Sequence, residues 1–282
     1  MASSDHSPAA TNGAGRSPLP PREVPVPPQE RSWALVTGAT GGIGAEFARY
    51  LAAHGSNLVL TGRNTVKLGD LARELGGTGA QLILLPVDLA DRAAREKLFT
   101  DLTNDGIRIS TLVNNAGFAL LEDVVDSDPD ELLDLLEVNV VALTHLSRMF
   151  LPGMLEAGQG TIINVASTAS YQAMPGFGAY GASKAYVRSF STALWAETKG
   201  TGVRVVCISP GPVHSNFWHR AGNDEVMRNR RQPRHVVETT FAALNANRPV
   251  VVDGRLNRVM SLATRVVPQS VAAQVGRFVV SR

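Results

Sequence analysis

The sequence predicts an α/β fold in which a parallel sheet of about seven strands carries helices on both faces. From Trp33 onward, short apolar segments alternate with segments of helical length. The apolar segments are rich in Val, Ile and Leu throughout, as strands covered on both faces are. A glycine-rich turn, residues 37–44, joins the first apolar segment to the first helical one. Such an alternation requires right-handed crossovers, and ligands then bind beyond the carboxyl ends of the strands.

The composition limits the class of protein. With 282 residues, 44% of them hydrophobic and 18% charged, the chain is long enough for one large domain with a sizeable core. A formal net charge of +2 is too small to indicate a nucleic-acid partner. The lone cysteine, Cys207, lies in an apolar segment, and no export leader or bilayer-length segment is evident. We therefore expect a protein of the reducing cytoplasm.

Three regions are expected along the chain. Residues 1–30 are rich in Pro, Ser, Ala and Gly, which predicts a disordered tail, with a Pro-rich docking motif as the alternative. Residues 31–254 form the expected folded domain. Residues 255–282 contain five arginines and no acid among apolar residues. We expect this basic amphipathic segment to pack on its own domain or on a partner subunit, and contact with an anionic membrane surface is the alternative.

The elements are expected in strict alternation. Segments with the length and composition of buried strands are 33–37, 57–61, 81–87, 111–114, 161–166, 203–209 and 249–252. Segments with helical patterns are 42–54, 65–75, 91–104, 129–155, 179–199 and 233–247. One helix start is well marked, because Asp128 offers an N-cap, Pro129 suits the first turn and Glu131 completes the motif.

The glycine-rich turn predicts a nucleotide site. Gly38, Gly42 and Gly44 allow a tight backbone turn and close approach of a pyrophosphate, with Thr40, Gly41 and Ile43 beside it. The following helix begins here, and its free N–H groups favour an anion. The alternative is a tight turn without a ligand. Its position after the first strand of an α/β pattern favours nucleotide binding.

The ends of the next strands indicate which nucleotide is bound. Enzymes that select NAD place an acid after the second strand, whereas this chain has Arg63, which can pair with a 2′-phosphate. This predicts NADP, and an ordinary solvated arginine is the alternative. Asp88 and Leu89 follow the third strand, where a carboxylate can accept from an adenine amino group. The fourth strand is followed by small residues that we expect to face the cofactor, namely Asn115, Ala116 and Gly117. The alternative is that they only form a turn.

A tyrosine, a lysine and a serine predict proton transfer at a carbonyl. Lys184 lies one helical turn after Tyr180, so we expect its ammonium to lower the pKa of the phenol from its usual value near 10. Ser167 would hold a substrate carbonyl against the phenol, with Ser170 as a nearby rival. The alternatives are a partly buried aromatic for Tyr180 and a turn-capping hydroxyl for Ser167.

Residues 32–253 resemble the short-chain dehydrogenase/reductase family. The resemblance rests on motifs at Thr37 to Gly44 and Asn114 to Gly117, on a tyrosine–lysine pair, and on a turn at Pro210 to Val213. It implies a doubly wound Rossmann-type sheet, NADP as cofactor, and a homodimer or homotetramer built on the helices at 129–155 and 179–199. The active-site tetrad that it implies is Asn139, Ser167, Tyr180 and Lys184.

The resemblance also implies roles for individual residues. Lys184 would hold the nicotinamide ribose, and Asn139 would tether a water that links Lys184 to solvent. The residues expected around the nicotinamide carboxamide are Pro210, Gly211, Val213 and Ser215. Ser215 departs from the family pattern, because His214 separates it from the turn.

The expected reaction is hydride transfer from NADPH to a ketone or aldehyde carbonyl, or the reverse oxidation of a secondary alcohol, with Tyr180 as general acid or base. One alternative is a non-catalytic NADP-binding regulator or scaffold. Another is an epimerase or dehydratase of the same family. The six histidines have no metal-ligand spacing, so we assign no metal.

The segment 213–231 is expected to cover the substrate. It contains Phe217 and Trp218, followed by four arginines, Arg220, Arg228, Arg230 and Arg231. An aromatic pocket with a basic rim suits a bulky apolar ketone or an acyl thioester. A mobile, solvated lid is an equal alternative.

Overall fold

A computed structural model gives the fold of the chain. The structure describes Met1, residues 32–215, Phe217, residues 230–264, and residues 267, 268, 270, 271, 273 and 274. The expected tail at 1–30, except for Met1, and most of the expected substrate cover, 216 and 218–229, lie outside the described residues. The end of the chain from residue 275 also lies outside them.

The described residues form one sheet of seven parallel strands in the order β3-β2-β1-β4-β5-β6-β7. The strands are β1 (Trp33–Thr37), β2 (Asn57–Gly62), β3 (Leu82–Pro86), β4 (Ile109–Asn114), β5 (Gly160–Val165), β6 (Val203–Ser209) and β7 (Val250–Val252). This confirms the predicted doubly wound α/β fold. The strand order reverses between β1 and β4, so a crevice opens beyond their carboxyl ends.

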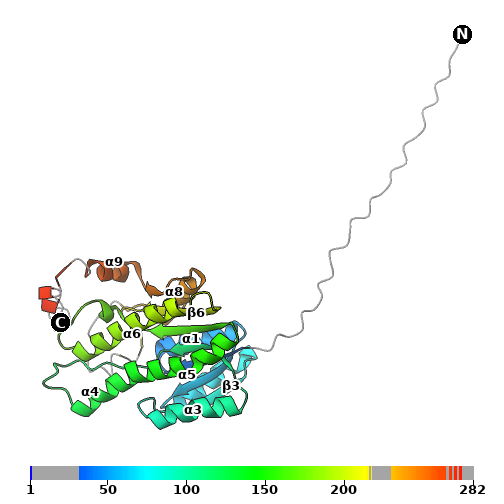
Figure 1. Cartoon of the computed structure of the whole chain (residues 1–282), viewed down its shortest axis with the longest axis horizontal. Helices are drawn as coiled ribbons and strands as arrows, with labels where there is room; N and C mark the ends of the chain where they lie inside the picture. The colour runs from blue at the N-terminus through cyan, green and yellow to red at the C-terminus, as the bar shows by residue number, and fades with distance from the viewer. Residues whose placement is uncertain are drawn as a thin grey trace. The chain divides into compact units, whose positions relative to one another are not determined.

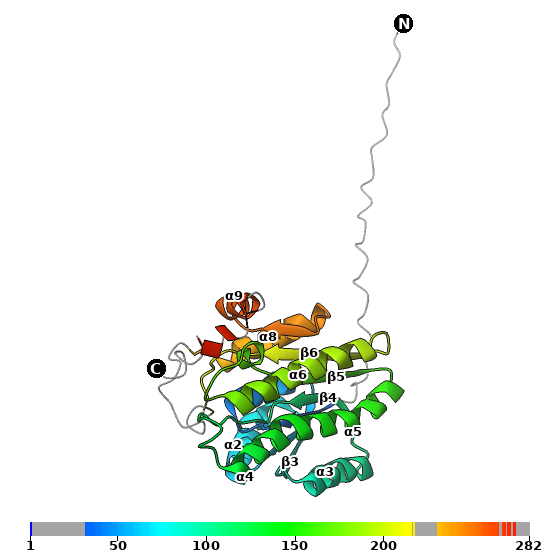
Figure 2. The ribbon, with the colours of Figure 1, turned by 60° about the vertical axis from the view of Figure 1, so that its left-hand side comes forward.

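Helices cover both faces of this sheet (Figures 1 and 2). One face carries α1 (Gly42–Ala53), α2 (Thr65–Leu75) and α8 (Pro233–Asn245). The other carries α3 (Arg92–Asn104), α5 (Leu143–Glu156) and α6 (Gly178–Glu197). Short 3-10 turns lie at η1 (Gly76–Thr78) and η3 (Thr168–Tyr171). The expected helices agree with these bounds to within a few residues, except over 129–155.

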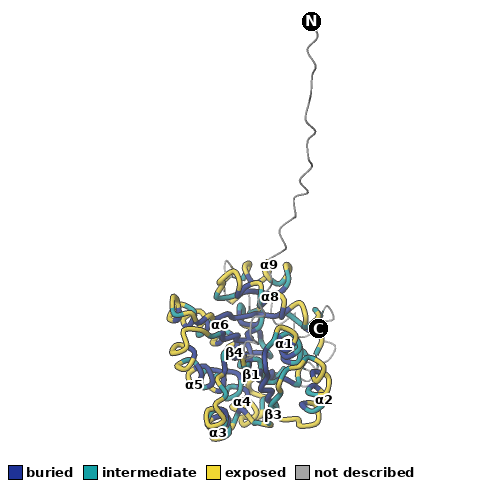
Figure 3. Tube along the Cα trace, turned by 90° about the vertical axis from the view of Figure 1, so that its right-hand side faces the viewer, coloured by how far each residue is buried: buried dark blue, intermediate teal, exposed yellow. Residues whose placement is uncertain are grey.

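The strands contribute apolar side chains to two separate core layers, one on each face of the sheet. In β1, Ala34 and Val36 pack towards α1, whereas Leu35 packs towards α3 and α5. Leu58 and Val59 divide in the same way in β2. Because both faces are buried, the strands have no polar alternation, and the buried residues concentrate along the sheet (Figure 3).

The predicted helical segment at 129–155 is helical throughout, but it is not one regular α-helix. The structure has α4 (Pro129–Leu136), then a π-helical segment η2 (Glu137–Ala142), and then α5. The start is as predicted, since the Asp128 carboxylate accepts from the backbone N–H of Asp130 at 2.8 Å and of Glu131 at 3.3 Å. A π-helical turn has no compositional signature, and such turns occur frequently at functional sites.

The chain continues after β7 into α9 (Arg255–Ala263) through Gly254, whose φ of +86° favours glycine. This helix packs against β7 and η3. Ser261 is buried, while Leu256, Val259, Met260 and Leu262 remain more than half exposed. No helix among the described residues is long and apolar enough to span a membrane.

Arg95 in α3 connects three elements although its side chain is almost fully buried. Its guanidinium donates to the backbone oxygen of Leu89, and it pairs with the Glu137 carboxylate at 2.8 Å. It thereby fixes the loop after β3 to the π-helical segment. A buried guanidinium without these partners would be strongly unfavourable, so the three elements depend on one another.

We predict that Arg95→Ala lowers the free energy of unfolding by about 3 kcal/mol, because it removes charge-assisted hydrogen bonds and leaves a cavity. Urea denaturation measures this loss. The control Arg92→Ala, on the same helix, breaks an exposed pair with Glu96 and should cost less than ~1 kcal/mol. Equal decreases in the free energy of unfolding for the two variants would contradict the inference that Arg95 connects the three elements.

Candidate active site

A cavity of about 930 Å³ lies beyond the carboxyl ends of the strands. Its lining begins at the glycine turn after β1 and continues to α9 at the opposite end of the described chain. Most of the predicted site residues line it: Gly38, Thr40, Gly41, Gly42, Ile43, Arg63, Asp88, Leu89, Asn115, Ala116, Gly117, Ser167, Tyr180, Lys184, Pro210, Gly211, Val213 and Ser215. Gly44, Asn139 and the rival hydroxyl Ser170 do not.

The glycine turn forms a cradle that side chains would block. Gly38 has a φ of +61°, and a Cβ there would lie 2.9 Å from the Cα of Ala116. A Cβ on Gly42 would lie 2.9 Å from the backbone oxygen of His214. Gly44 faces away from the cavity, and a Cβ there would collide with the backbone oxygen of Gly38. Its role is therefore the packing of α1 against the turn.

The beginning of α1 differs from those of α2, α3 and α4, whereas α6, α8 and α9 likewise begin without a side-chain cap. Asn64, Asp91 and Asp128 cap α2, α3 and α4 with side-chain oxygens. The N-cap of α1 is Gly41, and no side chain caps this helix. Its first N–H groups therefore remain for a ligand in the cavity, and the helix dipole there favours an anion. This cradle fits a pyrophosphate.

Hydrogen bonds between β1 and β4 hold the turn in place. The Asn115 side chain donates to the backbone oxygens of Thr37 at 2.9 Å and of Gly38 at 3.1 Å. The Thr37 hydroxyl accepts from the N–H groups of Asn115 and Ala116, both at 3.0 Å, and donates to Val113. Asn115 lines the cavity, but its amide is engaged in supporting the backbone around it.

Two cations and a carboxylate mark the end of the cavity beside β2 and β3. Arg63 and Asp88 are both about half exposed, with their charged groups 4.0 Å apart. The Asp88 carboxylate also accepts from the N–H of Ala90 at 3.0 Å. Sequence reasoning missed Lys67, which lines the cavity from the first turn of α2. The available signal was Asn64, because its N-cap bond to the N–H of Lys67 sets the helix start.

Asn139 lies in the π-helical segment and is buried outside the cavity. Its side chain accepts from the N–H of Phe118 at 3.1 Å and donates to the backbone oxygen of Phe118 at 3.0 Å and to Ser183 at 3.1 Å. A Cβ on Gly117 would lie 2.7 Å from the Asn139 oxygen and 3.2 Å from the Lys184 nitrogen. Asn139 thus joins the segment after β4 to α6, directly beside Lys184.

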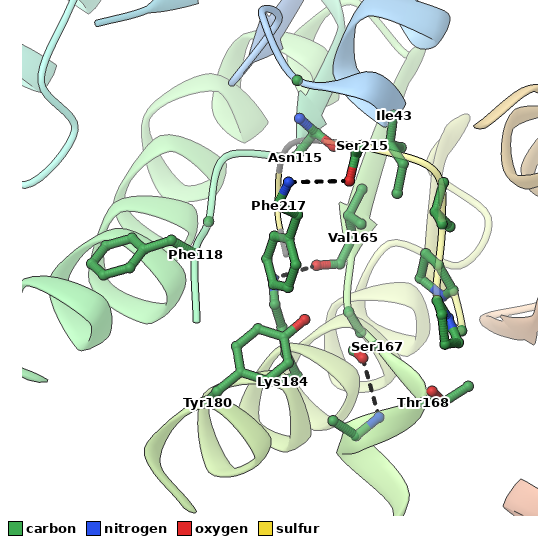
Figure 4. A pocket seen from close by; sticks show the side chains of 18 of the residues that line it. Ile43, Asn115, Phe118, Val165, Ser167, Thr168, Tyr180, Lys184, Ser215 and Phe217 are labelled. Atoms are coloured by element: carbon green, nitrogen blue, oxygen red, sulfur yellow. Dashed lines mark hydrogen bonds between the residues drawn. The ribbon is translucent and has the colours of Figure 1, made fainter. Parts of the chain in front are cut away.

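Ser167, Tyr180 and Lys184 meet in the cavity (Figure 4). Ser167 caps η3 by accepting from the N–H of Ala169 at 3.1 Å. Lys184 donates to the backbone oxygen of Val165 at 2.9 Å, and its nitrogen is 5.8 Å from the centre of the Tyr180 ring. Figure 4 shows the Phe217 ring beside that of Tyr180, with ring centres 5.7 Å apart.

The pKa values differ from the sequence-based expectation. Burial raises the pKa of Tyr180 to about 12, although a hydrogen bond with Ser167 lowers it in part. Burial lowers the pKa of Lys184 to about 8. The expected lowering of the phenol pKa by the Lys184 ammonium is therefore wrong for this structure, since desolvation dominates and the ammonium donates to Val165. The phenol is protonated at neutral pH and is placed to donate a proton.

One of the four arginines expected to form a basic rim around the substrate pocket, Arg231, is engaged in an ion pair. Arg231 donates to the fully buried Asp253 carboxylate at 2.5 Å, and its backbone pairs with that of Val213. It closes the turn after β6 and is not a free cation at the cavity. Arg220, Arg228 and Trp218 lie outside the described residues, and Arg230 is not among the residues that line the cavity. Ser215 lines the cavity and accepts from the N–H of Phe217 at 3.4 Å.

These features define the class of protein. A glycine cradle at the point where the strand order reverses, opposite a buried phenol and a serine hydroxyl, is typical of a dinucleotide-binding α/β oxidoreductase. The comparison with known families makes this more specific. Residues 32–226 match the short chain dehydrogenase family, so the chain belongs to it, and it is an oxidoreductase of that family.

The chain is similar in sequence to NADP-dependent dehydrogenases and to reductases. The NADP-dependent 3-hydroxy acid dehydrogenase YdfG of Escherichia coli K12 is 39% identical over 180 residues, which cover 64% of this chain and 71% of that protein. Sulfoacetaldehyde reductase 2 of Chromohalobacter salexigens is 37% identical over 194 residues, which cover 68% and 77%.

Solved structures are also similar. A short-chain dehydrogenase from Sphingobium yanoikuyae in complex with NADPH has a TM-score of 0.75 at 28% identity and covers 85% of this chain and 97% of its own. Serine dehydrogenase complexed with NADP⁺ has a TM-score of 0.70 at 33% identity and covers 78% and 93%.

The lowered pKa of Lys184 predicts a pH dependence of stability. The unfolded chain keeps this proton up to about 10.5, whereas the folded chain loses it near 8. Between these values the unfolded state binds more protons, so the free energy of unfolding gains a contribution that rises with pH. Urea denaturation between pH 7.5 and 9.5 should show a steeper rise in the wild type than in Lys184→Met.

A matched control separates this effect from a general change in charge. Lys199→Met removes an exposed ammonium just after α6 and should keep the wild-type pH dependence. If Lys184→Met and the wild type follow parallel curves, the pKa of Lys184 is not lowered by burial.

Proposed function

We propose that the protein is an NADP-dependent oxidoreductase that reduces a ketone or aldehyde carbonyl, or oxidises the matching secondary alcohol. The observation that carries this proposal is the meeting of the buried Tyr180 phenol with the Ser167 hydroxyl in the cavity that the uncapped start of α1 also lines. The phenol supplies a proton, and the cradle accepts a dinucleotide.

The residues around the cavity fit NADP. The N–H groups of Gly42 and Ile43 would hold the pyrophosphate, because no side chain caps the α1 terminus, whereas the N–H of Gly41 donates to the backbone oxygen of Gly38. Arg63 and Lys67 would pair with the 2′-phosphate. Bound NADPH supplies the hydride. The names of similar proteins support this choice, since they include NADP-dependent enzymes and structures that contain NADPH or NADP⁺.

The side chains divide the remaining work of carbonyl reduction. Ser167 donates a hydrogen bond to the carbonyl oxygen and stabilises its developing negative charge, an effect worth ~3 kcal/mol in other enzymes. Tyr180 gives its phenolic proton to that oxygen while the carbonyl carbon receives the hydride, so the C=O bond becomes a C–OH group. The phenolate then regains a proton from solvent, while Lys184, whose nitrogen lies 5.8 Å from the centre of the Tyr180 ring, would hold the nicotinamide ribose. Asn139 positions Lys184 by supporting Gly117 and α6.

Two alternative functions are distinguished from this proposal by experiment. A non-catalytic NADP-binding regulator needs the glycine cradle but has no need for Tyr180 beside Ser167. An epimerase or dehydratase would use the same residues without net consumption of the cofactor. Loss of absorbance at the nicotinamide band, with NADPH and NADH tested against ketones, aldehydes, sugars and acyl thioesters, distinguishes all three.

Tyr180→Phe should keep NADPH binding and lose at least ~100-fold in kcat, because the ring remains and the proton donor is removed. Fluorescence titration measures the binding, and absorbance at the nicotinamide band measures turnover. Tyr186→Phe is the control, since Tyr186 is exposed on the same helix outside the cavity. A Tyr180→Phe variant with ordinary turnover would remove this residue from the chemistry.

The double variant Arg63→Ala/Lys67→Ala should raise the KM for NADPH at least ~10-fold and that for NADH much less, because each lost charge-assisted bond to phosphate is worth ~1.5–3 kcal/mol. Arg73→Ala, on the same helix but paired with Asp70, is the control. A parallel change for both nucleotides would show that these cations do not select NADP.

We further propose a cytoplasmic homodimer or homotetramer that associates through the faces of α5 and α6. These faces contain partly exposed apolar side chains, including Val141 just before α5, Leu155 and Tyr186. Light scattering should give at least twice the mass of one chain, and Tyr186→Glu should shift the particle towards a monomer. A wild-type protein that is a monodisperse monomer at micromolar concentration contradicts this proposal.

A further inference from the structure

The last described helix forms one wall of the catalytic cavity. Seven residues from this region line it: Leu256, Asn257, Met260, Ser261, Ala263, Thr264 and Val267. All of them lie beyond residues 32–226, the segment that matches the family. The substrate cover expected from the sequence was the segment 213–231, so this wall is an addition to the expected site.

Two large apolar side chains of this wall, Leu256 and Met260, are more than half exposed, and the wall also contains the polar residues Asn257, Ser261 and Thr264. Leu256 and Met260 lie four positions apart, hence on one side of α9, and both line the cavity. They are 66% and 56% exposed. A single exposed apolar side chain is common, but two on the lining of one cavity offer a continuous apolar surface to a ligand.

Other apolar side chains line the cavity around the catalytic phenol. Phe177 and Phe217 have ring centres 5.5 and 5.7 Å from that of Tyr180. Phe118 and Met174 line the same cavity. Figure 4 shows the Phe217 ring above that of Tyr180 and Phe118 to the left of both. An apolar surface is therefore present both beside the reacting group and on α9.

The charged residues that line the cavity do not lie on α9. Among the described residues that line it, Arg63, Lys67 and Asp88 belong to the end beside β2 and β3, and Lys184 donates to Val165. The part of the lining from α9 contributes no formal charge. Within the described lining, no cation at this end would neutralise a carboxylate or a sulfonate. An uncharged apolar group suits this end better than the acidic groups in the names of the relatives.

We propose that the substrate carries an extended apolar chain that lies along α9 against Leu256 and Met260, with its carbonyl at Tyr180. The proposal rests on the proposed carbonyl reduction and names its substrate class as an aliphatic ketone of medium or long chain. NADPH and a proton convert the ketone to the secondary alcohol and NADP⁺. Each methylene that reaches this wall should raise kcat/KM about 4-fold, equivalent to ~0.8 kcal/mol.

The test uses the full-length protein, NADPH and unbranched alkan-2-ones from 2-butanone to 2-dodecanone. In the wild type, kcat/KM should rise with chain length and then level off. Leu256→Ser/Met260→Ser should reduce the advantage of 2-dodecanone over 2-butanone at least 10-fold, mainly through KM. Val259→Ser is the matched control, because Val259 is 64% exposed on the same helix and does not line the cavity. It should keep the wild-type dependence on chain length.

A binding measurement separates this proposal from the proposed reaction. The thermal unfolding temperature of Tyr180→Phe with NADPH should rise on addition of 2-dodecanone, and the added Ser substitutions should abolish that rise. If 2-dodecanone binds but no ketone consumes NADPH in the wild type, the proposed reaction fails and the apolar site stands. The apolar site is overturned if kcat/KM is flat along the series, if 3-oxobutanoate is preferred to 2-dodecanone, or if Val259→Ser loses as much as the double variant.

Discussion

The hydrogen bonds that join β1 to β4 are the constraint on which the rest of the site depends. These two strands are neighbours in space although they are far apart in sequence, and the strand order reverses between them. Thr37 and Asn115 fill the junction and bond to the backbone on both sides of it. These bonds hold the glycine turn in place, and α1 begins with its N–H groups at the cavity.

In the proposed function, the two halves of the chemistry belong to different elements. The turn after β1 would hold phosphate, whereas the Ser167 hydroxyl follows β5 and the Tyr180 hydroxyl lies on α6. Two contacts connect these regions. Gly117, after β4, leaves room for the side chains of Asn139 and Lys184, and Lys184 donates to the backbone oxygen of Val165 at the end of β5. Polar groups that are buried in this way must be fully hydrogen-bonded, which makes their positions well defined.

The sequence predicted the architecture because its signals are local and repeated. Apolar runs of strand length, the Asp128 cap and the four-residue spacing of Tyr180 and Lys184 each depend on a few neighbouring residues. Three features depend on tertiary burial and were not predictable from such signals. They are the π-helical segment that contains Asn139, the direction of the Tyr180 pKa shift, and the position of α9 at the cavity. Spacing places two groups together, but only the fold determines how much water surrounds them.

The position of α9 has a consequence for how such enzymes diversify. This helix follows the last strand after Asp253 and Gly254, and it shares no segment with the cradle or the tyrosine helix. In the proposed site, substitutions in α9 would therefore change which substrates are accepted without changing Ser167, Tyr180 or Lys184. Exchange of this terminal helix between homologous enzymes is accordingly a direct way to engineer new selectivity without redesigning the catalyst.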